Sequence, residues 1–289
     1  MMFTFDIETV IFFLLLSLGA SIVNGGLGYG YSSISVPLAL LVLVNRIINP
    51  AYVLLEALLN TVMLLLSGKR RALPLLRRTM PVMVSLVPGV VVGSLILSTI
   101  APLSMKFLVY ALLLPLILLQ AAGFRRPIRS ETTAAVPLGV GIGLLYSITT
   151  MSGPPIALFW NNQGLKKDEF KTALAEIRVV ESYMTAISYY FLGLFTTTSL
   201  SLFTVIAPPV IFGLPLGILI VRRVAVETFR RICMSFDAWI VGYGLSGTFS
   251  SLFERGIVLG FVLWSGAVAI DLVLLYRFFR NKALRGLIR

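Results

Sequence analysis

Long apolar runs separated by short polar connections dominate the chain. They cover residues 11–44, 50–67, 79–99, 103–122, 136–163, 170–193, 201–221, 232–248 and 256–279. These runs reach the length of about 20 residues that a helix needs to cross a bilayer. The chain is 58% hydrophobic and 12% charged, which is about half the charge content of an average soluble protein. The pattern predicts an all-α polytopic membrane protein, folded as a single membrane domain over residues 1–289.

The fifth apolar run contains MSGPPIALFW, a sequence that interrupts a continuous helix. Proline has no backbone N–H and a fixed φ, so Pro154 and Pro155 suit the first turn of a helix better than its interior. We predict a helix that ends near Thr150, a short unwound turn, and a second helix that begins at about Pro154. Ser152 or Gly153 would cap that start.

The first apolar run contains a similar interruption near residues 24–31, within NGGLGYGYSSISVP, where glycines take the place of the prolines. Lipid cannot satisfy the N–H groups that a break frees, so a broken helix at membrane depth lines a cavity or packs inside protein. With the positive end of the helix dipole, these groups form a site for an anion. Two matched breaks indicate the binding site of a transporter. The alternative is that the glycines only allow close packing and the prolines only kink the chain.

The basic residues suggest an orientation. There are 24 Lys and Arg against 12 Asp and Glu, and they cluster in connections between apolar runs, which is the positive-inside pattern. The expected partner is therefore a lipid bilayer and not nucleic acid. If both broken segments crossed fully, the basic connections at 166–171 and 222–231 would lie outside. If each is a re-entrant pair of half-helices of about fourteen residues, or ~21 Å, every strongly basic connection and the C-terminus are cytoplasmic. We favour the re-entrant arrangement.

The two halves of the chain resemble each other. Repeat 1 covers residues 11–122, repeat 2 covers 136–248, and a C-terminal transmembrane helix covers 256–279. Each repeat has a broken helix followed by three transmembrane helices, and the re-entrant arrangement makes the repeats inverted. The matched positions, at offsets of 124 or 125, are Glu56 with Glu181, Gly89 with Gly213, Gly93 with Gly217, and Lys106 with Arg230.

Ionisable residues within spans are costly and are usually functional. Glu56 and Glu181 lie near the middle of matching segments, and Arg178 precedes Glu181 by one helical turn. Arg178 and Glu181 could form a structural ion pair at i, i+3. Alternatively, Arg178 binds an anionic group of the substrate by charge-assisted hydrogen bonds, and Glu56 or Glu181 carries a coupling proton. Asp237 and Asp271, in later spans, are expected to be structural or to face a cavity.

Neutral groups around the two breaks complete the expected substrate site. Together with Arg178, its candidate residues are Asn24, Gly28, Tyr29, Gly30, Tyr31, Ser32, Ser33, Thr150, Ser152, Gly153, Pro154 and Asn161. The chain has no histidine and one cysteine, Cys233, which excludes a His- or Cys-based metal site and a His-dependent triad. We therefore expect no metal, no cofactor and no catalytic residue, and we do not expect an enzyme.

The glycine-rich breaks that open each half, with Pro37 after the first, Gly153 and two prolines in the second, and glycine pairs in the third span of each half, resemble the sulfite exporter TauE/SafE family. These are DUF81-type permeases of four-helix repeats, and the likeness runs from about Leu14 to Gly247. It implies a secondary transporter of the bacterial inner membrane for sulfite, organosulfonates or other sulfur-containing anions. The site would lie near the midplane between the two broken helices.

The chain departs from the glycine-rich consensus of that family at Tyr29, Tyr31 and Met151 and at the prolines of the second break. These bulkier residues leave the size and identity of the substrate open. The direction of transport and proton coupling are also open. An anion channel, or a permease for a small carboxylate, is the alternative. A homodimer is an expectation from the packing-prone glycine faces.

Overall fold

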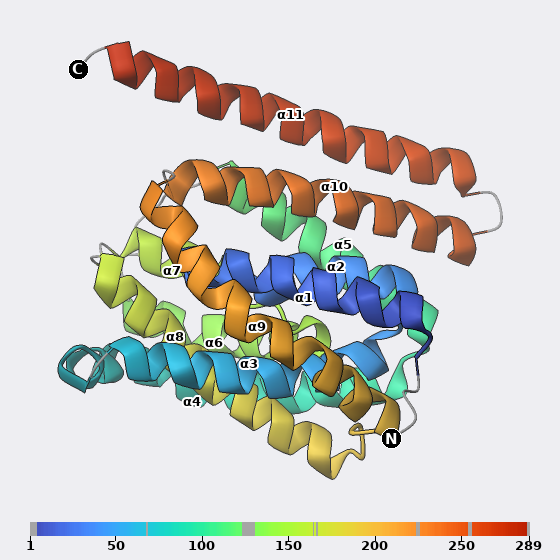
Figure 1. Ribbon diagram of the computed structural model, residues 1–289, viewed down its shortest axis with the longest axis horizontal. Coiled ribbons are helices and arrows are strands. Elements are labelled where there is room, and N and C mark those ends of the chain that lie inside the picture. The colour runs from blue at the N-terminus through green and yellow to red at the C-terminus, as the bar shows by residue number, and fades with distance from the viewer. Residues whose placement is uncertain are drawn as a thin grey trace.

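The computed structural model describes residues 5–67, 69–122, 131–163, 165, 167–223, 226–253 and 256–287. These residues form eleven helices and no strand (Figure 1). The helices are α1 (Ile7–Leu27), α2 (Tyr31–Val42), α3 (Asn45–Ser67), α4 (Lys69–Thr99), α5 (Pro102–Ala121), α6 (Glu131–Thr149), α7 (Gly153–Asn162), α8 (Lys167–Phe191), α9 (Thr197–Arg223), α10 (Val226–Leu252) and α11 (Ile257–Leu287). Within these ranges, six helices are long and apolar enough to cross a membrane. The predicted all-α membrane protein is confirmed.

Both predicted breaks are present. α6 ends at Thr149 and α7 begins at Gly153, as the prolines indicate. The first break is narrower than expected, because α1 continues through the first glycines and only Gly28 and Gly30 adopt left-handed backbone, with φ of +83° and +109°. Glycine adopts such φ values without the steric cost that a Cβ brings.

The arms of each break differ in length. α1 has 21 residues and α2 has 12, while α6 has 19 and α7 has 10. Each break therefore joins a long helix to a short one. The expectation of two half-helices of about fourteen residues, or ~21 Å, is wrong. α2 packs against α1 (Figure 1).

Glycines set the closest helix contacts. α4 packs on α6, and α1 packs on α9. A Cβ added at Gly89 of α4 would lie 2.1 Å from the carbonyl oxygen of Val140 on α6. A Cβ added at Gly217 of α9 would lie 1.9 Å from the carbonyl oxygen of Ile22 on α1. We call these two contacts, α4 with α6 and α1 with α9, the glycine seams. If each broken helix is counted as one span, α4 and α9 are the third spans of their repeats. Each therefore packs on the first helix of the other repeat, with no room for a side chain at the contact.

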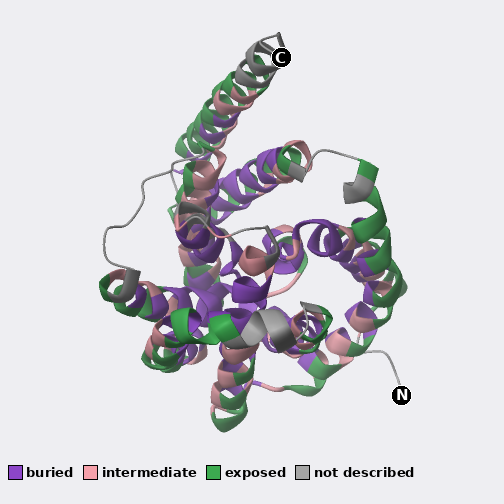
Figure 2. Ribbon diagram, turned by 90° about the vertical axis from the view of Figure 1, so that its left-hand side faces the viewer, coloured by how far each residue is buried: buried purple, intermediate pink, exposed green. Residues whose placement is uncertain are grey.

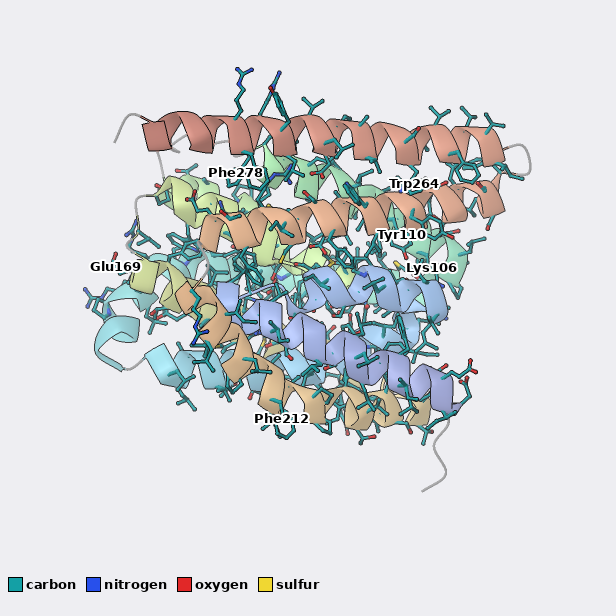
Figure 3. The ribbon with its side chains drawn as sticks, turned by 45° about the horizontal axis from the view of Figure 1, so that its top comes forward. Lys106, Tyr110, Glu169, Phe212, Trp264 and Phe278 are labelled. Carbon is teal, nitrogen blue, oxygen red and sulfur yellow. The ribbon has the colours of Figure 1, made fainter. Side chains whose placement is uncertain are left out.

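The outer helices expose apolar side chains. α11 lies at the edge of the bundle against α10 (Figure 1), and most of its described residues are exposed or half-buried (Figure 2). Phe212 of α9 is 69% exposed and lies on the outside of the bundle (Figure 3). Large apolar residues on an outer face are expected where the neighbour is lipid.

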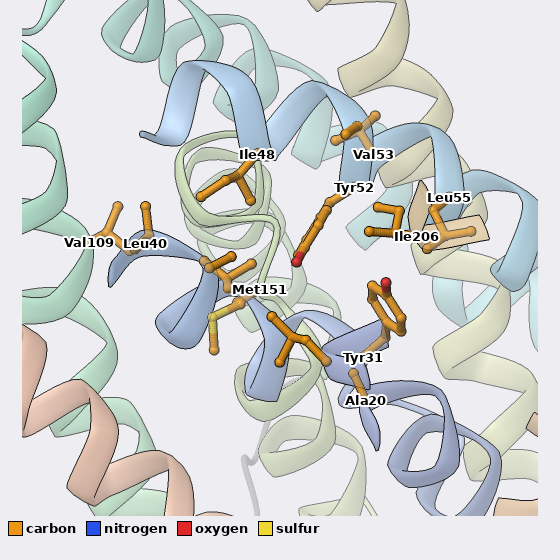
Figure 4. Close-up of a cluster of buried hydrophobic side chains, with 14 of the residues drawn as sticks. Ala20, Tyr31, Leu40, Ile48, Tyr52, Val53, Leu55, Val109, Met151 and Ile206 are labelled. Carbon is orange, nitrogen blue, oxygen red and sulfur yellow. The ribbon is translucent and has the colours of Figure 1, made fainter. Parts of the chain in front are cut away.

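The interior around the first break is aromatic. Tyr31 of α2 and Tyr52 of α3 pack edge to face, with ring centroids 5.6 Å apart. Met151, from the second break, belongs to the same buried cluster (Figure 4). The two breaks are therefore packed together in the core.

Candidate functional site

Glu56 of α3 is the centre of a buried polar network. Its side chain is fully buried and accepts three hydrogen bonds from described residues. Ser32 Oγ donates to Oε1 at 2.6 Å, Arg178 Nη2 donates to Oε1 at 2.9 Å, and the Tyr146 hydroxyl donates to Oε2 at 2.9 Å. These partners come from α2, α8 and α6, so one carboxylate joins four helices from the two halves of the chain.

Glu181 of α8 forms the matching contact in the second half. Its Oε2 accepts a hydrogen bond of 2.5 Å from Ser152 Oγ, and its Oε1 has no hydrogen-bond partner. Ser152 occupies the N-cap position of α7 but makes no side-chain cap. Ser152 is thus at the expected cap position, but its side chain accepts no backbone N–H and its hydroxyl donates to Glu181.

Each short helix therefore presents a serine at its N-terminus to a glutamate of the next helix. The pairs are Ser32 with Glu56 and Ser152 with Glu181. A helix N-terminus favours negative charge through its dipole and its free N–H groups. In this structure the protein's own glutamates lie at the positions that the breaks predict for an anion.

Arg178 does not pair within its own helix. Its Nη2 contacts Glu56, and the predicted i, i+3 pair with Glu181 is wrong. Arg178 is 4% exposed, and its Nε has no hydrogen-bond partner. Among the described carboxylates, this guanidinium forms its ion pair with Glu56 and not with Glu181.

Other predicted site residues lie at or beside the two breaks. Thr150 has φ of +55°, which is unusual for a residue with a branched side chain and marks backbone strain at the second break. Tyr31 donates to Ser17 Oγ at 2.9 Å. Asn24 is buried on α1, and its Oδ1 has no hydrogen-bond partner. The side chains of Pro154 and Asn161 lie outside the described part of the structure.

Most of the remaining predicted residues lie on the side of the first break that faces α5 and α10. Tyr29, Gly30 and Ser33 line a cavity between this break, α5 and α10. The Tyr29 ring also covers the start of α7, because a Cβ added at Gly153 would lie 2.8 Å from its Cδ2. Gly28 lies against Lys171, whose Cγ would be 3.6 Å from an added Cβ. The candidates thus divide between the glutamate network and this cavity.

Tyr146 is the site residue that the candidate set lacks. It lies one turn before Thr150, in the last turn of α6, and its hydroxyl binds Glu56. In the sequence, only its position just before the second break pointed to the site. An aromatic side chain at such a position can equally well serve packing alone. Among the described residues, no group of three His, Cys, Asp or Glu side chains could hold a metal ion.

An all-helical membrane fold with buried ionic groups between two broken helices defines the class as a membrane transport protein. The chain belongs to the sulfite exporter TauE/SafE family, whose model matches residues 13–244. The match confirms the resemblance read from the breaks, and it ends within α10, before α11. No significant match was found among curated proteins or among solved structures.

Proposed function

We propose that this protein is a secondary transporter for a small sulfur-containing anion, sulfite or an organosulfonate, with its site between the two helix breaks. The observation that supports it best is the Arg178–Glu56 ion pair, which lies beside the N-terminus of α2 and within a network that reaches α6 and α8. Arg178 and the helix N-termini supply the charge and the donors that an oxyanion requires.

Exchange between the bound glutamate and the substrate gives a mechanism. A substrate anion takes the place of the Glu56 carboxylate on Arg178 and on the hydroxyls of Ser32 and Tyr146. Glu56, deprived of its cation, then binds a proton, because a buried carboxylate without a partner is costly. Anion and proton are thereby bound in the same step. Glu181, whose one hydrogen bond from the described residues comes from Ser152, is the alternative proton carrier.

Alternating access would use the two repeats, residues 11–122 and 136–248, as moving parts. The glycine seams between α4 and α6 and between α1 and α9 couple each repeat to the first helix of the other. Small residues allow helices to slide without side-chain clashes. Glu56 is held by residues of α2, α6 and α8, so a shift of α6 or α8 against α3 would change its contacts.

We place the protein in the bacterial inner membrane with a cytoplasmic C-terminus. Figure 1 shows the ends of α3, α7, α9 and α11 at one end of the bundle, and the ends of α4, α8 and α10 at the other. The sequence places its strongly basic connections after the first group of helices. The positive-inside rule then makes that end cytoplasmic, as the re-entrant arrangement expects.

Ligand-dependent thermal shift of the purified protein with sulfite, organosulfonates, sulfate and carboxylates tests the substrate class. We expect stabilisation by a sulfur oxyanion in the wild type and no stabilisation in Arg178→Gln. Arg46→Gln is the matched control, since Arg46 binds the backbone carbonyls of Leu97, Ser98 and Ile100 and not the glutamate network. A response to carboxylates alone would overturn the substrate, and an unchanged response in folded Arg178→Gln would overturn the site.

Flux into proteoliposomes separates a carrier from a channel. We expect saturable sulfite uptake that acidifies the lumen in proportion to the anion moved, because anion and proton bind in the same step. Flux that rises linearly with concentration and moves no protons would show a channel and contradict the exchange mechanism.

A further inference from the structure

Asp237 of α10 is a buried acid that the proposed exchange does not use. Its side chain is 6% exposed, and its Oδ1 has no hydrogen-bond partner. It lines the cavity beside the first break, whose volume is about 20 Å³, which is room for about one water molecule. The polar residues around this cavity are Tyr29, Ser33, Gln120, Arg230 and Cys233.

The groups facing Asp237 do not neutralise it. Arg230 and Cys233 share its helix, Gln120 comes from α5, Tyr29 comes from the first break, and Ser33 comes from α2. α1 contributes only apolar side chains to the cavity. No ion pair joins Asp237 to a described cation, and on the side toward α11 the Arg231 guanidinium is taken by Asp271.

Asp271 of α11 shows the contrasting case. It is fully buried, but Arg231 Nη2 binds its Oδ1 at 2.8 Å and Trp239 Nε1 donates to its Oδ2 at 3.1 Å. This carboxylate has the cation and donors that keep a buried charge stable. For Asp237, one helix away, the described residues supply no ion-pair partner and no donor to Oδ1.

We propose that Asp237 and the water-sized cavity beside it form a second proton-binding site, separate from the network of Glu56, Arg178 and Glu181. A buried carboxyl group without a cation is most stable as the neutral acid, which can hydrogen-bond to one water molecule. When the cavity opens or Arg230 turns toward it, the charged form becomes favourable and the proton leaves. The part of this inference that concerns coupling rests on the proposed transport function.

The predicted repeat argues against a purely structural role. At the offset of 124 that pairs Lys106 with Arg230, Asp237 corresponds to Leu113, which is buried in the core. The equivalent place in the first half is thus filled by an apolar side chain, as close packing alone would favour. Burying the Asp237 carboxyl group costs desolvation free energy that an apolar side chain such as leucine would avoid. Its presence therefore points to a role other than packing.

Tyr29 connects this cavity to the substrate site. Its hydroxyl accepts a hydrogen bond of 3.2 Å from Gln120 Nε2 at the cavity, and its ring lies against Gly153 at the start of α7. Ser152, the neighbour of Gly153, holds Glu181. A movement of the first break that shifts Tyr29 would therefore alter the cavity of Asp237 and the surroundings of Glu181 together.

Infrared difference spectroscopy of the purified protein during a pH jump tests proton binding without a substrate. We expect the wild type to show a carbonyl band from a protonated carboxylic acid that Asp237→Asn loses and Asp271→Asn retains. Asp237→Leu, which installs the residue of the corresponding place, is the second variant in case the asparagine variant does not fold. An unchanged band in folded Asp237 variants would overturn the site.

The role in coupling has its own readout. With sulfite as the probe in proteoliposomes, we expect Asp237→Asn to bind sulfite as the wild type does and to change the pH dependence of uptake, because only the proton site at the glutamate network remains. An unchanged pH dependence would overturn the coupling role even if the band is lost. If the wild type moves no sulfite, the proposed function fails, while the infrared result still decides whether Asp237 binds a proton.

Discussion

Arg178 reaches across the molecule to bind Glu56, a residue 122 positions earlier in the chain, at 2.9 Å. It does so although Glu181 lies one turn away on its own helix. The pair joins α8 to α3 and leaves Glu181 to Ser152. The two glutamates at matching places are therefore unequal: one has a cation and one does not.

This inequality predicts different effects of neutralising each acid. Glu56→Gln leaves Arg178 buried without a counter-charge, and breaking a buried pair in this way costs about 3–5 kcal/mol. Glu181→Gln removes no ion pair, and its amide oxygen can still accept from Ser152, so the expected cost is below about 1 kcal/mol. The free energy of unfolding in detergent, measured for both variants, checks the difference. Equal losses would contradict the assigned ion pair.

The sequence predicted those features that depend on local chemistry. Pro154 and Pro155 located the second break, because proline restricts the backbone wherever it occurs. The first break was predicted too broadly. Glycine permits a left-handed conformation without requiring it, and only Gly28 and Gly30 in that stretch adopt one.

The sequence did not predict the long-range partners. Arg178 and Glu181 have a spacing that allows pairing on an isolated helix, but packing brings Glu56 closer to the guanidinium. The role of Tyr146 was missed for the same reason, since its acceptor lies 90 residues away. Partners of this kind are set by how helices assemble, which no spacing rule within one helix describes.

Two glycines of α6 predict opposite outcomes of the same substitution. A Cβ at Gly143 would lie 2.1 Å from the carbonyl oxygen of Leu86 on α4, while a Cβ at Gly141 would meet nothing within 4 Å. Gly143→Ala forces the two helices apart and is expected to cost about 1–3 kcal/mol. Gly141→Ala is expected to be neutral or to stabilise by up to about 1 kcal/mol. Thermal unfolding of the two variants checks this, and a loss in Gly141→Ala would show that α6 packs differently.

The ion pair of Arg231 and Asp271 predicts how α11 is held. Asp271→Asn leaves the guanidinium of Arg231 buried without a counter-charge and should destabilise the protein by about 3–5 kcal/mol. The double variant Arg231→Met with Asp271→Leu should recover most of that loss, because it leaves neither charge unpaired. Chemical unfolding of the single and double variants measures this. A double variant as unstable as the single one would show that the pair itself, and not the stranded charge, stabilises the contact.

Comparing two tyrosines, Tyr146 and Tyr110, can distinguish a role in substrate binding from a role in stability. Tyr146 donates to the Glu56 carboxylate at 2.9 Å, and Tyr110 donates to the carbonyl oxygen of Pro37 at the same distance. Replacing either by phenylalanine removes one buried hydrogen bond and keeps the ring, at about 1–3 kcal/mol of stability. Only Tyr146→Phe also removes a donor from the position where the substrate is proposed to replace Glu56.

We therefore expect Tyr146→Phe to weaken sulfite binding by about tenfold, which corresponds to about 1.4 kcal/mol, while Tyr110→Phe leaves it unchanged. Titration calorimetry with sulfite on both variants provides the comparison. If Tyr146→Phe binds sulfite as tightly as Tyr110→Phe does, the hydroxyl serves only to hold Glu56. The anion would then be bound by Arg178 and by the groups at the two helix N-termini, Ser32 and Ser152 with the backbone beside them.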